Sequence, residues 1–383
     1  MLVKKSKMKE VGVNTQSLFF NLLKAGLWPE PEKQVSVDGN VDWEEIYQLA
    51  IDQSVLGLVL AGIDCLPIDQ RPPKVLLLQW IGEIQMLEQK NKEMNAFIGE
   101  LVDKMREAGI YTLLVKGQGV AQCYSRPLWR SCGDVDFFLN EDNYKKAKEF
   151  LVPMASRIEQ EGELSKHLGL TIDPWIVELH GTLRSSLSFR VNKALDEIKD
   201  DVFFGGNVRS WMNGHTQVFL LGVDSDVIYI FAHFLSHFYK GGVGLRQICD
   251  WCRLLWTYKD KVNVSKLENR LLRMGLMSEW KAFATLAVDY LGMPAESMPF
   301  YSTGKKWKRK AARIVAFVIK VGNFGHNRDS SFYEKYSYLL RKAISFSRVC
   351  LDLVHHARIF PVDSFRFIPS IVLNGVKAAA RGE

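Results

Sequence analysis

The sequence predicts an α+β fold, in which a small mixed β-sheet is flanked by helical regions before and after it. Apolar residues recur at helical spacing from about residue 14 to 108, and again beyond about residue 224. Between these stretches, short apolar runs rich in strand-forming residues alternate with helix-like segments. We therefore expect three regions, 1–108, 109–222 and 223–383, of which the middle one carries the sheet.

The first region is expected to consist mostly of helices. The segment Trp43–Leu60 opens with acidic residues, which favour a helix N-terminus. A proline-rich loop follows it. The long segment Val75–Glu107 then places apolar residues on one side and ends before Gly109, a residue type that commonly ends helices.

The middle region is expected to alternate strands and helices. Three strands are predicted, at Ile110–Val115, Gly133–Leu139 and Trp175–His180. A helix is expected to begin at Val120–Tyr124, and another at Glu141–Leu151 opens with acids. This order brings polar residues to the ends of the strands.

The last region is again expected to be helical. Helix candidates are Val227–Tyr239, Leu245–Tyr258, Val264–Met274, Lys305–Arg313 with a dense basic face, and Ser337–Val354. No internal repeat or low-complexity segment interrupts the 383 residues.

The composition is that of a packed globular protein, with 47% hydrophobic residues and a net charge of +7. This mild excess suits an anionic ligand such as a nucleotide and does not require nucleic acid. The six cysteines form no disulfide framework, and Cys249 and Cys252 are interpreted as buried thiols. The first ten residues lack the apolar segment of a secretory signal, and no run of 18 apolar residues occurs, so we expect a cytoplasmic protein without a membrane span.

The most informative motif is Asp134-Val135-Asp136, which follows Gly133. On a strand, the two carboxylates point to one face and the apolar residues to the other. Two adjacent acids repel each other unless a cation lies between them, and Mg²⁺ prefers such oxygen ligands. Taken alone, the motif is more often a strand entering a turn with solvated acids than a metal site.

Lys116 and Gly117 lie where a predicted strand ends and a helix begins. Free backbone N–H groups at such a junction favour anions, and Gly117 and Gly119 carry no side chain that would block a phosphate. Lys116 adds a positive charge. The alternative is a simple turn with a solvated lysine.

Two further charged residues belong to the same region. Arg130 lies four residues before Asp134 and could pair with that acid or with a nucleotide phosphate. Glu178 alternates with apolar residues on the last predicted strand. It faces solvent unless this strand neighbours the aspartate strand. In that case three carboxylates could hold two divalent ions.

In this order, the motifs resemble those of an uncharacterised bacterial nucleotidyltransferase family within the polymerase-β-like superfamily. The resemblance covers about residues 111–258. It rests on Leu114-Val115-Lys116-Gly117, on Arg130-Ser131-Cys132-Gly133-Asp134-Val135-Asp136-Phe137-Phe138-Leu139, and on Val177-Glu178-Leu179-His180.

The resemblance implies transfer of a nucleoside monophosphate from a nucleoside triphosphate to an acceptor, with release of pyrophosphate. Asp134, Asp136 and Glu178 would be the catalytic and metal-binding residues, with Mg²⁺ or Mn²⁺ as the cofactor. The acceptor would be a sugar phosphate, a protein or another small molecule. The nucleotide would be held by Lys116, Gly117, Arg130, Ser131 and Gly133. Where the superfamily usually has Gly-Ser, this chain has Lys116-Gly117.

Two other functions fit parts of the sequence. A glycosyltransferase would use Asp134 and Asp136 to hold a manganese–nucleotide-sugar complex, but it requires a parallel sheet within residues 14–108. A catalytically inactive nucleotide-binding or regulatory protein of the same fold would account for the departure at Gly117.

The last region contributes three further charged features. His233 and His237 have the spacing of zinc ligands on a helix, although a core or supporting role fits them better. Arg246 and Asp250 could form an exposed pair or brace the helices against the site. The basic cluster in Lys305–Arg313 is either a solvated helix face or a contact for an anionic acceptor or nucleic acid.

Overall fold

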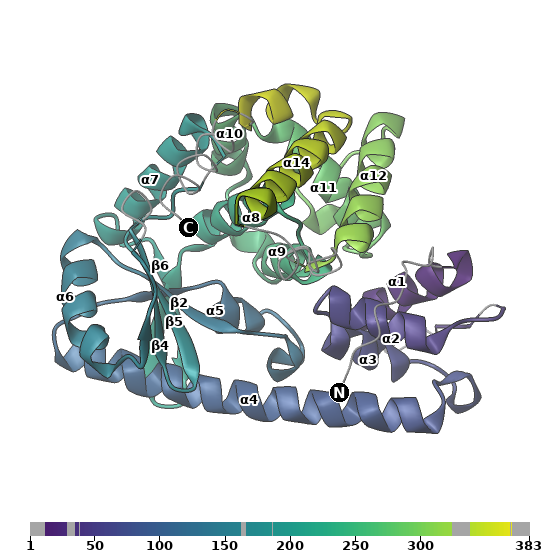
Figure 1. The fold of residues 1–383 in the computed structure, drawn as a ribbon, viewed down its shortest axis with the longest axis horizontal. Coiled ribbons are helices and arrows are strands. Elements are labelled where there is room, and N and C mark those ends of the chain that lie inside the picture. The colour runs from purple at the N-terminus through teal and green to yellow at the C-terminus, as the bar shows by residue number, and fades with distance from the viewer. Residues whose placement is uncertain are drawn as a thin grey trace.

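A computed structural model confirms the α+β prediction: helices precede and follow one seven-stranded mixed sheet. In Figure 1 the long helix α4 runs below the sheet, and the C-terminal helices lie above it. The structure describes residues 12–28, 35–37, 39–161, 166–185, 187–323, 338–367 and 369.

The N-terminal region begins with α1 (Val13–Leu27), α2 (Trp43–Asp52) and α3 (Leu56–Ile63). Helices α1 and α3 cross in direct backbone contact, because a Cβ on Gly26 or Gly62 would lie about 2 Å from a backbone oxygen of the other helix. The sequence predicted one helix over Trp43–Leu60, and this prediction was wrong. The helix is interrupted between α2 and α3, where Ser54 adopts a φ of 54°.

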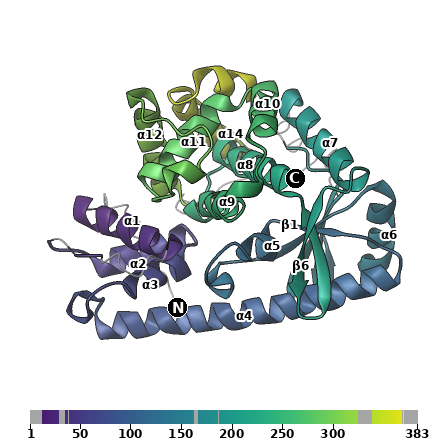
Figure 2. The same cartoon turned by 180° about the vertical axis from the view of Figure 1, so that it is seen from behind.

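Helix α4 (Lys74–Glu107) is 34 residues long and connects the N-terminal helices to the sheet. Trp80 packs in the core that α1 to α3 share, whereas Met94 and Ile98 pack in the core beneath the sheet. The helix therefore spans two hydrophobic cores with one continuous buried stripe. Figure 2 shows α4 extending along the whole molecule from behind.

The sheet has the strand order β3-β4-β5-β2-β1-β7-β6. The β2–β5 and β1–β7 pairs are parallel and the remaining pairs are antiparallel. The strands are β1 (Leu113–Val115), β2 (Asp134–Phe138), β3 (Arg157–Ile158), β4 (His167–Ile172), β5 (Trp175–His180), β6 (Val208–Asn213) and β7 (Thr216–Leu221).

Only β1, β2 and β5 were expected from the sequence, so the sheet is wider than predicted. Strands β6 and β7 form a hairpin whose two-residue loop follows Asn213, with Gly214 at a φ of 61°. Glycine at the first position of a two-residue loop between strands is a recognised hairpin signal. The hairpin was overlooked because β6 has no apolar alternation: its exposed positions hold Val208, Ser210 and Met212, and the positions between them are half-buried.

The two faces of the sheet contact different helices. Val135 and Val177 belong to the core formed with α4 and α6 (Glu141–Leu151). The opposite face, with Val115, packs in the core of the C-terminal helices. The short helix α5 (Gly117–Ala121) follows β1 on this second face. Because Asp134 and Asp136 alternate with Val135, they point toward the C-terminal helices.

The C-terminal region is a helical cluster built around aromatic side chains (Figures 1 and 2). Trp251 and Trp280 are fully buried and contact each other edge to face. The helices are α7 (Phe189–Phe203), α8 (Val223–Lys240), α9 (Leu245–Thr257), α10 (Val264–Met274), α11 (Met277–Asp289), α12 (Lys305–Val321) and α14 (Tyr338–Ala357). Single 3₁₀ turns occur at Ile68–Gln70, Pro127–Trp129, Val152–Met154, Lys259–Lys261 and Ala295–Ser297.

Two features of this region bear on the sequence predictions. Cys249 and Cys252 are buried free thiols within α9, as interpreted from the sequence. The basic cluster opens α12, where Lys305 and Lys308 are exposed. Among the described residues, no helix has the length and apolar character needed to cross a membrane.

Candidate active site at the centre of the sheet

The register of two parallel strands brings the predicted acids together. Asp136 on β2 pairs directly with Glu178 on β5, so both side chains leave the same face of the sheet. Asp134 lies two residues earlier on that face. One carboxylate oxygen from each of the three residues lies within 4.8 Å of the others. The strand that carries Glu178 therefore neighbours the strand that carries the two aspartates.

Lys116 provides a positive charge at this acidic cluster. Its Nζ lies 2.7 Å from Asp136 Oδ1, and the Asp136 side chain is only 2% exposed. Burial opposes the lysine charge, but the carboxylate of Asp136 outweighs it and raises the pKa of Lys116 well above its usual value. Repulsion from Asp136, followed by burial, raises the pKa of Asp134. The three carboxylates therefore carry more negative charge than Lys116 can neutralise.

The backbone at Lys116 adopts an unusual conformation, with φ 58° and ψ −145°. Residues that carry a side chain rarely adopt these φ and ψ angles, and such backbone strain persists only where the surrounding structure imposes it. Gly117 follows with a φ of 43°. These angles turn the chain sharply from β1 into α5, and they direct the lysine side chain to Asp136. Helix α5 has only five residues, so its dipole contributes little.

Gly119 has a packing role that differs from the predicted one. A Cβ at this position would lie 2.7 Å from Leu220 Cδ2 on β7. The glycine therefore lets α5 approach the sheet, and the expectation that it clears space for a phosphate was wrong. In contrast, a Cβ on Gly133 would meet no atom within 4 Å. The backbone just before Asp134 is thus open to an incoming group.

Two histidines that sequence reasoning had not assigned to the site lie beside Glu178. His167 Nε2 is 3.0 Å and His180 Nε2 is 3.4 Å from Glu178 Oε2, and His180 Nε2 is 2.8 Å from Asp136 Oδ1. Burial favours the neutral acid, but hydrogen bonds from both imidazoles lower the pKa of Glu178. Burial also opposes charge on His180, yet its bonds to Asp136 and Glu178 raise its pKa.

Arg130 does not pair with Asp134, which corrects one alternative drawn from the sequence. Its Nε and Nη2 each donate a 2.7 Å hydrogen bond to Asp250 on α9, and Tyr124 Oη donates another to the same carboxylate. Burial favours neutral Asp250, but the guanidinium of Arg130 prevails and lowers its pKa. The bidentate buried pair fastens the loop before β2 to α9.

Arg246 and Asp250 do not form the exposed pair considered from the sequence. Asp250 is buried against Arg130, and Arg246 Nη1 donates a hydrogen bond of 3.2 Å to the carbonyl oxygen of Ser131. The other reading, that these residues brace the helices against the site, agrees with this arrangement. Ser131 thus contributes its backbone to the brace.

The loop before β2 is also held from below by α4. The buried Asn91 donates through Nδ2 to the carbonyl oxygens of Leu128 and Arg130, at 2.7 and 2.9 Å. Gln118 of α5 in turn donates to Asn91 Oδ1. A buried asparagine within an otherwise apolar helix stripe was the sequence signal for this contact.

A cavity of about 60 Å³ opens beside Asp134 and Asp136, whereas Glu178 is not among the residues that line it. Its volume suits ions or water better than a whole nucleotide. His233 of α8 lies in its wall, with Nε2 3.1 Å from His237 Nε2. Burial and the nearby Lys116 lower the pKa of both histidines, that of His237 to about 4. The cavity is lined by Lys116, Gly117, Val120, Arg130, Asp134, Asp136, Ile230, His233, Phe234, Arg246, Gln247 and Asp250.

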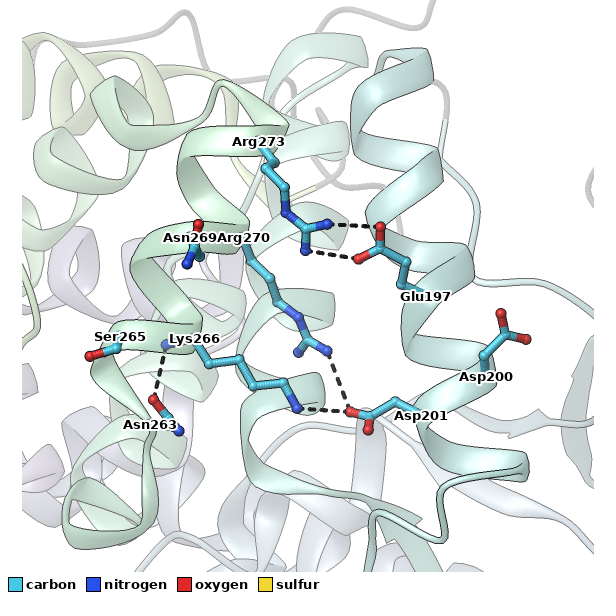
Figure 3. Close-up of a pocket in the computed structure, with 9 residues that line it drawn as sticks. All are labelled: Glu197, Asp200, Asp201, Asn263, Ser265, Lys266, Asn269, Arg270 and Arg273. Carbon is cyan, nitrogen blue, oxygen red and sulfur yellow. Dashed lines mark hydrogen bonds and ion pairs between the residues drawn. The ribbon is translucent and has the colours of Figure 1, made fainter.

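A second, larger cavity of about 900 Å³ lies between α7 and α10 and shares no lining residue with the first. In Figure 3 its basic side chains point to acids across the gap. Arg273 donates hydrogen bonds from Nη1 and Nη2 to the carboxylate of Glu197. Asp201 accepts hydrogen bonds from Lys266 Nζ and Arg270 Nη2. These charges neutralise one another, so this cavity shows no unbalanced charge for a nucleotide.

The donor set of the first site fits divalent cations. Three carboxylates face one lysine, and oxygen-rich clusters of this kind bind Mg²⁺ or Mn²⁺. In a comparison with protein families, residues 39–292 match the family described as "Uncharacterised nucleotidyltransferase". No curated protein and no solved structure matched the chain.

Proposed function

The chain belongs to a family of uncharacterised nucleotidyltransferases, and from this premise we propose that it is a metal-dependent enzyme. It would transfer a nucleoside monophosphate from a nucleoside triphosphate to an acceptor and release pyrophosphate. The observation that carries this proposal is the convergence of Asp134, Asp136 and Glu178 on one face of the sheet. The acceptor would be a sugar phosphate, a protein or another small molecule.

In this proposal, Asp134, Asp136 and Glu178 hold Mg²⁺ or Mn²⁺. The bound ions supply charge stabilisation for the phosphates and lower the pKa of the attacking hydroxyl. Glu178 would be the third metal ligand, because burial opposes its charge but hydrogen bonds from His167 and His180 lower its pKa and keep it ionised. A carboxylate with so low a pKa is a weak base, so the proton of the attacking hydroxyl would pass to solvent water. The triphosphate lies across the mouth of the small cavity, since the cavity itself accommodates ions only.

The predicted nucleotide-binding residues divide into two roles. Lys116 and Gly117 line the cavity, and Gly133 leaves open space beside its backbone. We assign these three to contacts with phosphate. Arg130 and Ser131 instead hold the loop, because the guanidinium of Arg130 is occupied by Asp250 and the carbonyl of Ser131 by Arg246.

The structure also weighs against the glycosyltransferase alternative. That activity required a parallel sheet within residues 14–108. The described residues from 12 to 108 form helices and turns only. The inactive nucleotide-binding alternative keeps the same fold, so only a measurement of turnover separates it from an enzyme.

The test is a transfer assay with Mg²⁺ or Mn²⁺ and each of the four triphosphates labelled at the α-phosphate. Candidate acceptors are sugar phosphates, proteins and the chain itself. We expect pyrophosphate release and a labelled product, and Asp136→Asn should lower the rate at least about 10³-fold. Asp69→Asn, which changes an exposed aspartate in the turn after α3, is the matched control. Calorimetric binding of a nucleotide without any turnover would support the inactive alternative.

A further inference from the structure

We propose that the site contains a second metal position with imidazole ligands, formed by His167, Glu178 and His180. It would take a first-row transition-metal ion such as Mn²⁺, Zn²⁺ or Co²⁺ in preference to Mg²⁺. The role of this ion in turnover rests on the proposed function, whereas its binding can be measured without it. The position is distinct from the all-carboxylate set, with which it shares only Glu178.

The strand register creates this position. His167 on β4 lies directly opposite His180 on β5, and Glu178 is two residues before His180 on the same face. The two imidazole rings have centroids 4.8 Å apart. Both Nε2 atoms point to the same carboxylate oxygen, Oε2 of Glu178. Three potential ligands from two adjacent strands therefore converge from one side.

The distances agree with a shared ion. Two ligand atoms that each lie about 2.1 Å from one ion are about 3.0 Å apart at an octahedral angle and about 3.4 Å apart at a tetrahedral angle. The distances from Glu178 Oε2 to His167 Nε2 and His180 Nε2 are 3.0 and 3.4 Å. The spacing therefore suits a shared ion, but Nε2 of each histidine must first give up the proton that it shares with a carboxylate, so binding of the ion should release protons.

The ligand chemistry indicates which ions the position would prefer. Mg²⁺ takes oxygen ligands and releases its water reluctantly, whereas imidazole nitrogen suits zinc and other transition metals. Two histidines and one carboxylate are a set that binds catalytic zinc and iron. His180 also touches Asp136, at 2.8 Å, so the two positions are coupled through this contact.

The accessibility of the residues permits exchange of the ion. The side chains of His167 and Glu178 are 33% and 24% exposed, so the position opens to solvent at the edge of the cluster. Asp136, at 2%, lies deeper. An ion could therefore enter the imidazole position without passing the buried Lys116–Asp136 pair.

The experiment compares metal binding by the full chain after removal of metal by chelation. Calorimetric titrations with Mg²⁺, Mn²⁺ and Zn²⁺ are made on the wild type, His167→Ala and His215→Ala. His215 is an exposed histidine in the β6–β7 turn and serves as the matched control. We expect His167→Ala to lower Mn²⁺ and Zn²⁺ affinity about 10- to 100-fold, to change Mg²⁺ affinity less than about threefold, and His215→Ala to change none.

A spectroscopic measurement separates ligation from hydrogen bonding. If the imidazoles only orient Glu178 by hydrogen bonds, Co²⁺ bound to the wild type will have the weak visible spectrum of an octahedral oxygen site, which would overturn the proposal. Imidazole is a stronger-field ligand than a carboxylate, so nitrogen ligation predicts visible bands at shorter wavelength than those of an all-oxygen site, and this shift should be lost in His167→Ala. Circular dichroism of each variant shows that it is folded. The metal titrations contain no nucleotide, so their outcome does not depend on turnover. A protein that binds Co²⁺ through imidazole here, but releases no pyrophosphate in the separate transfer assay, would support this proposal and contradict the proposed function.

Discussion

Two buried charged clusters lie close to the loop before β2, and they differ in charge balance. In the first, Asp250 accepts two hydrogen bonds from Arg130 and one from Tyr124, so its charge is neutralised. In the second, three carboxylates share Lys116 and His180. The difference teaches that a complete pair serves as scaffold, whereas an excess of acid is where we propose that a cation binds.

The physical reason is the cost of burying charge. An unpaired ion is unstable in a low-dielectric interior, so each buried charge needs a partner within the chain or a bound ion. Arg130 and Asp250 are partners within the chain. Repulsion from Asp136, followed by burial, raises the pKa of Asp134, which is the direction expected where acids outnumber their partners. The comparison can be tested by removing one carboxylate from each cluster.

The largest effect on stability is expected from Asp250→Asn. Without the carboxylate charge of Asp250, the guanidinium of Arg130 is buried without an ionic partner. This should lower the free energy of unfolding by about 3–5 kcal/mol. Urea unfolding measures this change. Asp260→Asn, at an exposed position after α9, is the control. A loss below about 1 kcal/mol would remove the scaffold role of this pair.

A smaller effect on the free energy of unfolding is expected when the pH is lowered, because of the pair of His233 and His237 beside the cavity. The folded pKa of His237 is about 4, below the usual 6.5, so only the unfolded chain takes up its proton between these values. Stability is therefore complete above about pH 6.5 and falls as the pH drops toward 4, by about 1–2 kcal/mol for this partly buried residue. Thermal unfolding of His237→Gln should show a flatter acid profile; an unchanged profile would contradict this assignment.

The smallest effect is expected from Asp134→Asn in protein free of metal. Because repulsion from Asp136 raises the pKa of Asp134, its charge opposes folding above that pKa. Removing the charge should stabilise the chain by up to about 1 kcal/mol in a chelator, and should reduce the stabilisation by added Mg²⁺. Differential scanning calorimetry under both conditions measures this. A destabilisation in chelator would mean that Asp134 is paired like Asp250.

The parts of the fold and site that depend on local pattern could be predicted from the sequence. The alternation of Asp134 and Asp136 with apolar residues identified both the strand and the acidic face. The same period placed Glu178 on the correct face of its strand. Whether these residues act in catalysis stays a prediction, because the geometry shows only that they meet.

The parts that depend on distant contacts could not be predicted. His167 enters the cluster through its pairing with His180, and that register is invisible in a single chain segment. Asp250 and Arg130 are 120 residues apart, so the nearer Arg246 attracted the pairing hypothesis instead. Strand β6 mixes polar and apolar residues on both of its faces, so it lacks the apolar period that identifies a half-buried strand.

The length of α4 has a consequence for how this fold can change in evolution. Its 34 residues span about 51 Å, with Trp80 fixed in one core, Met94 in another and Asn91 on the site loop between them. One inserted residue between the two cores would rotate the far end by about 100° and move the asparagine off the loop. Insertions and deletions should therefore be tolerated in this helix only as sets that restore its angular phase, such as seven residues.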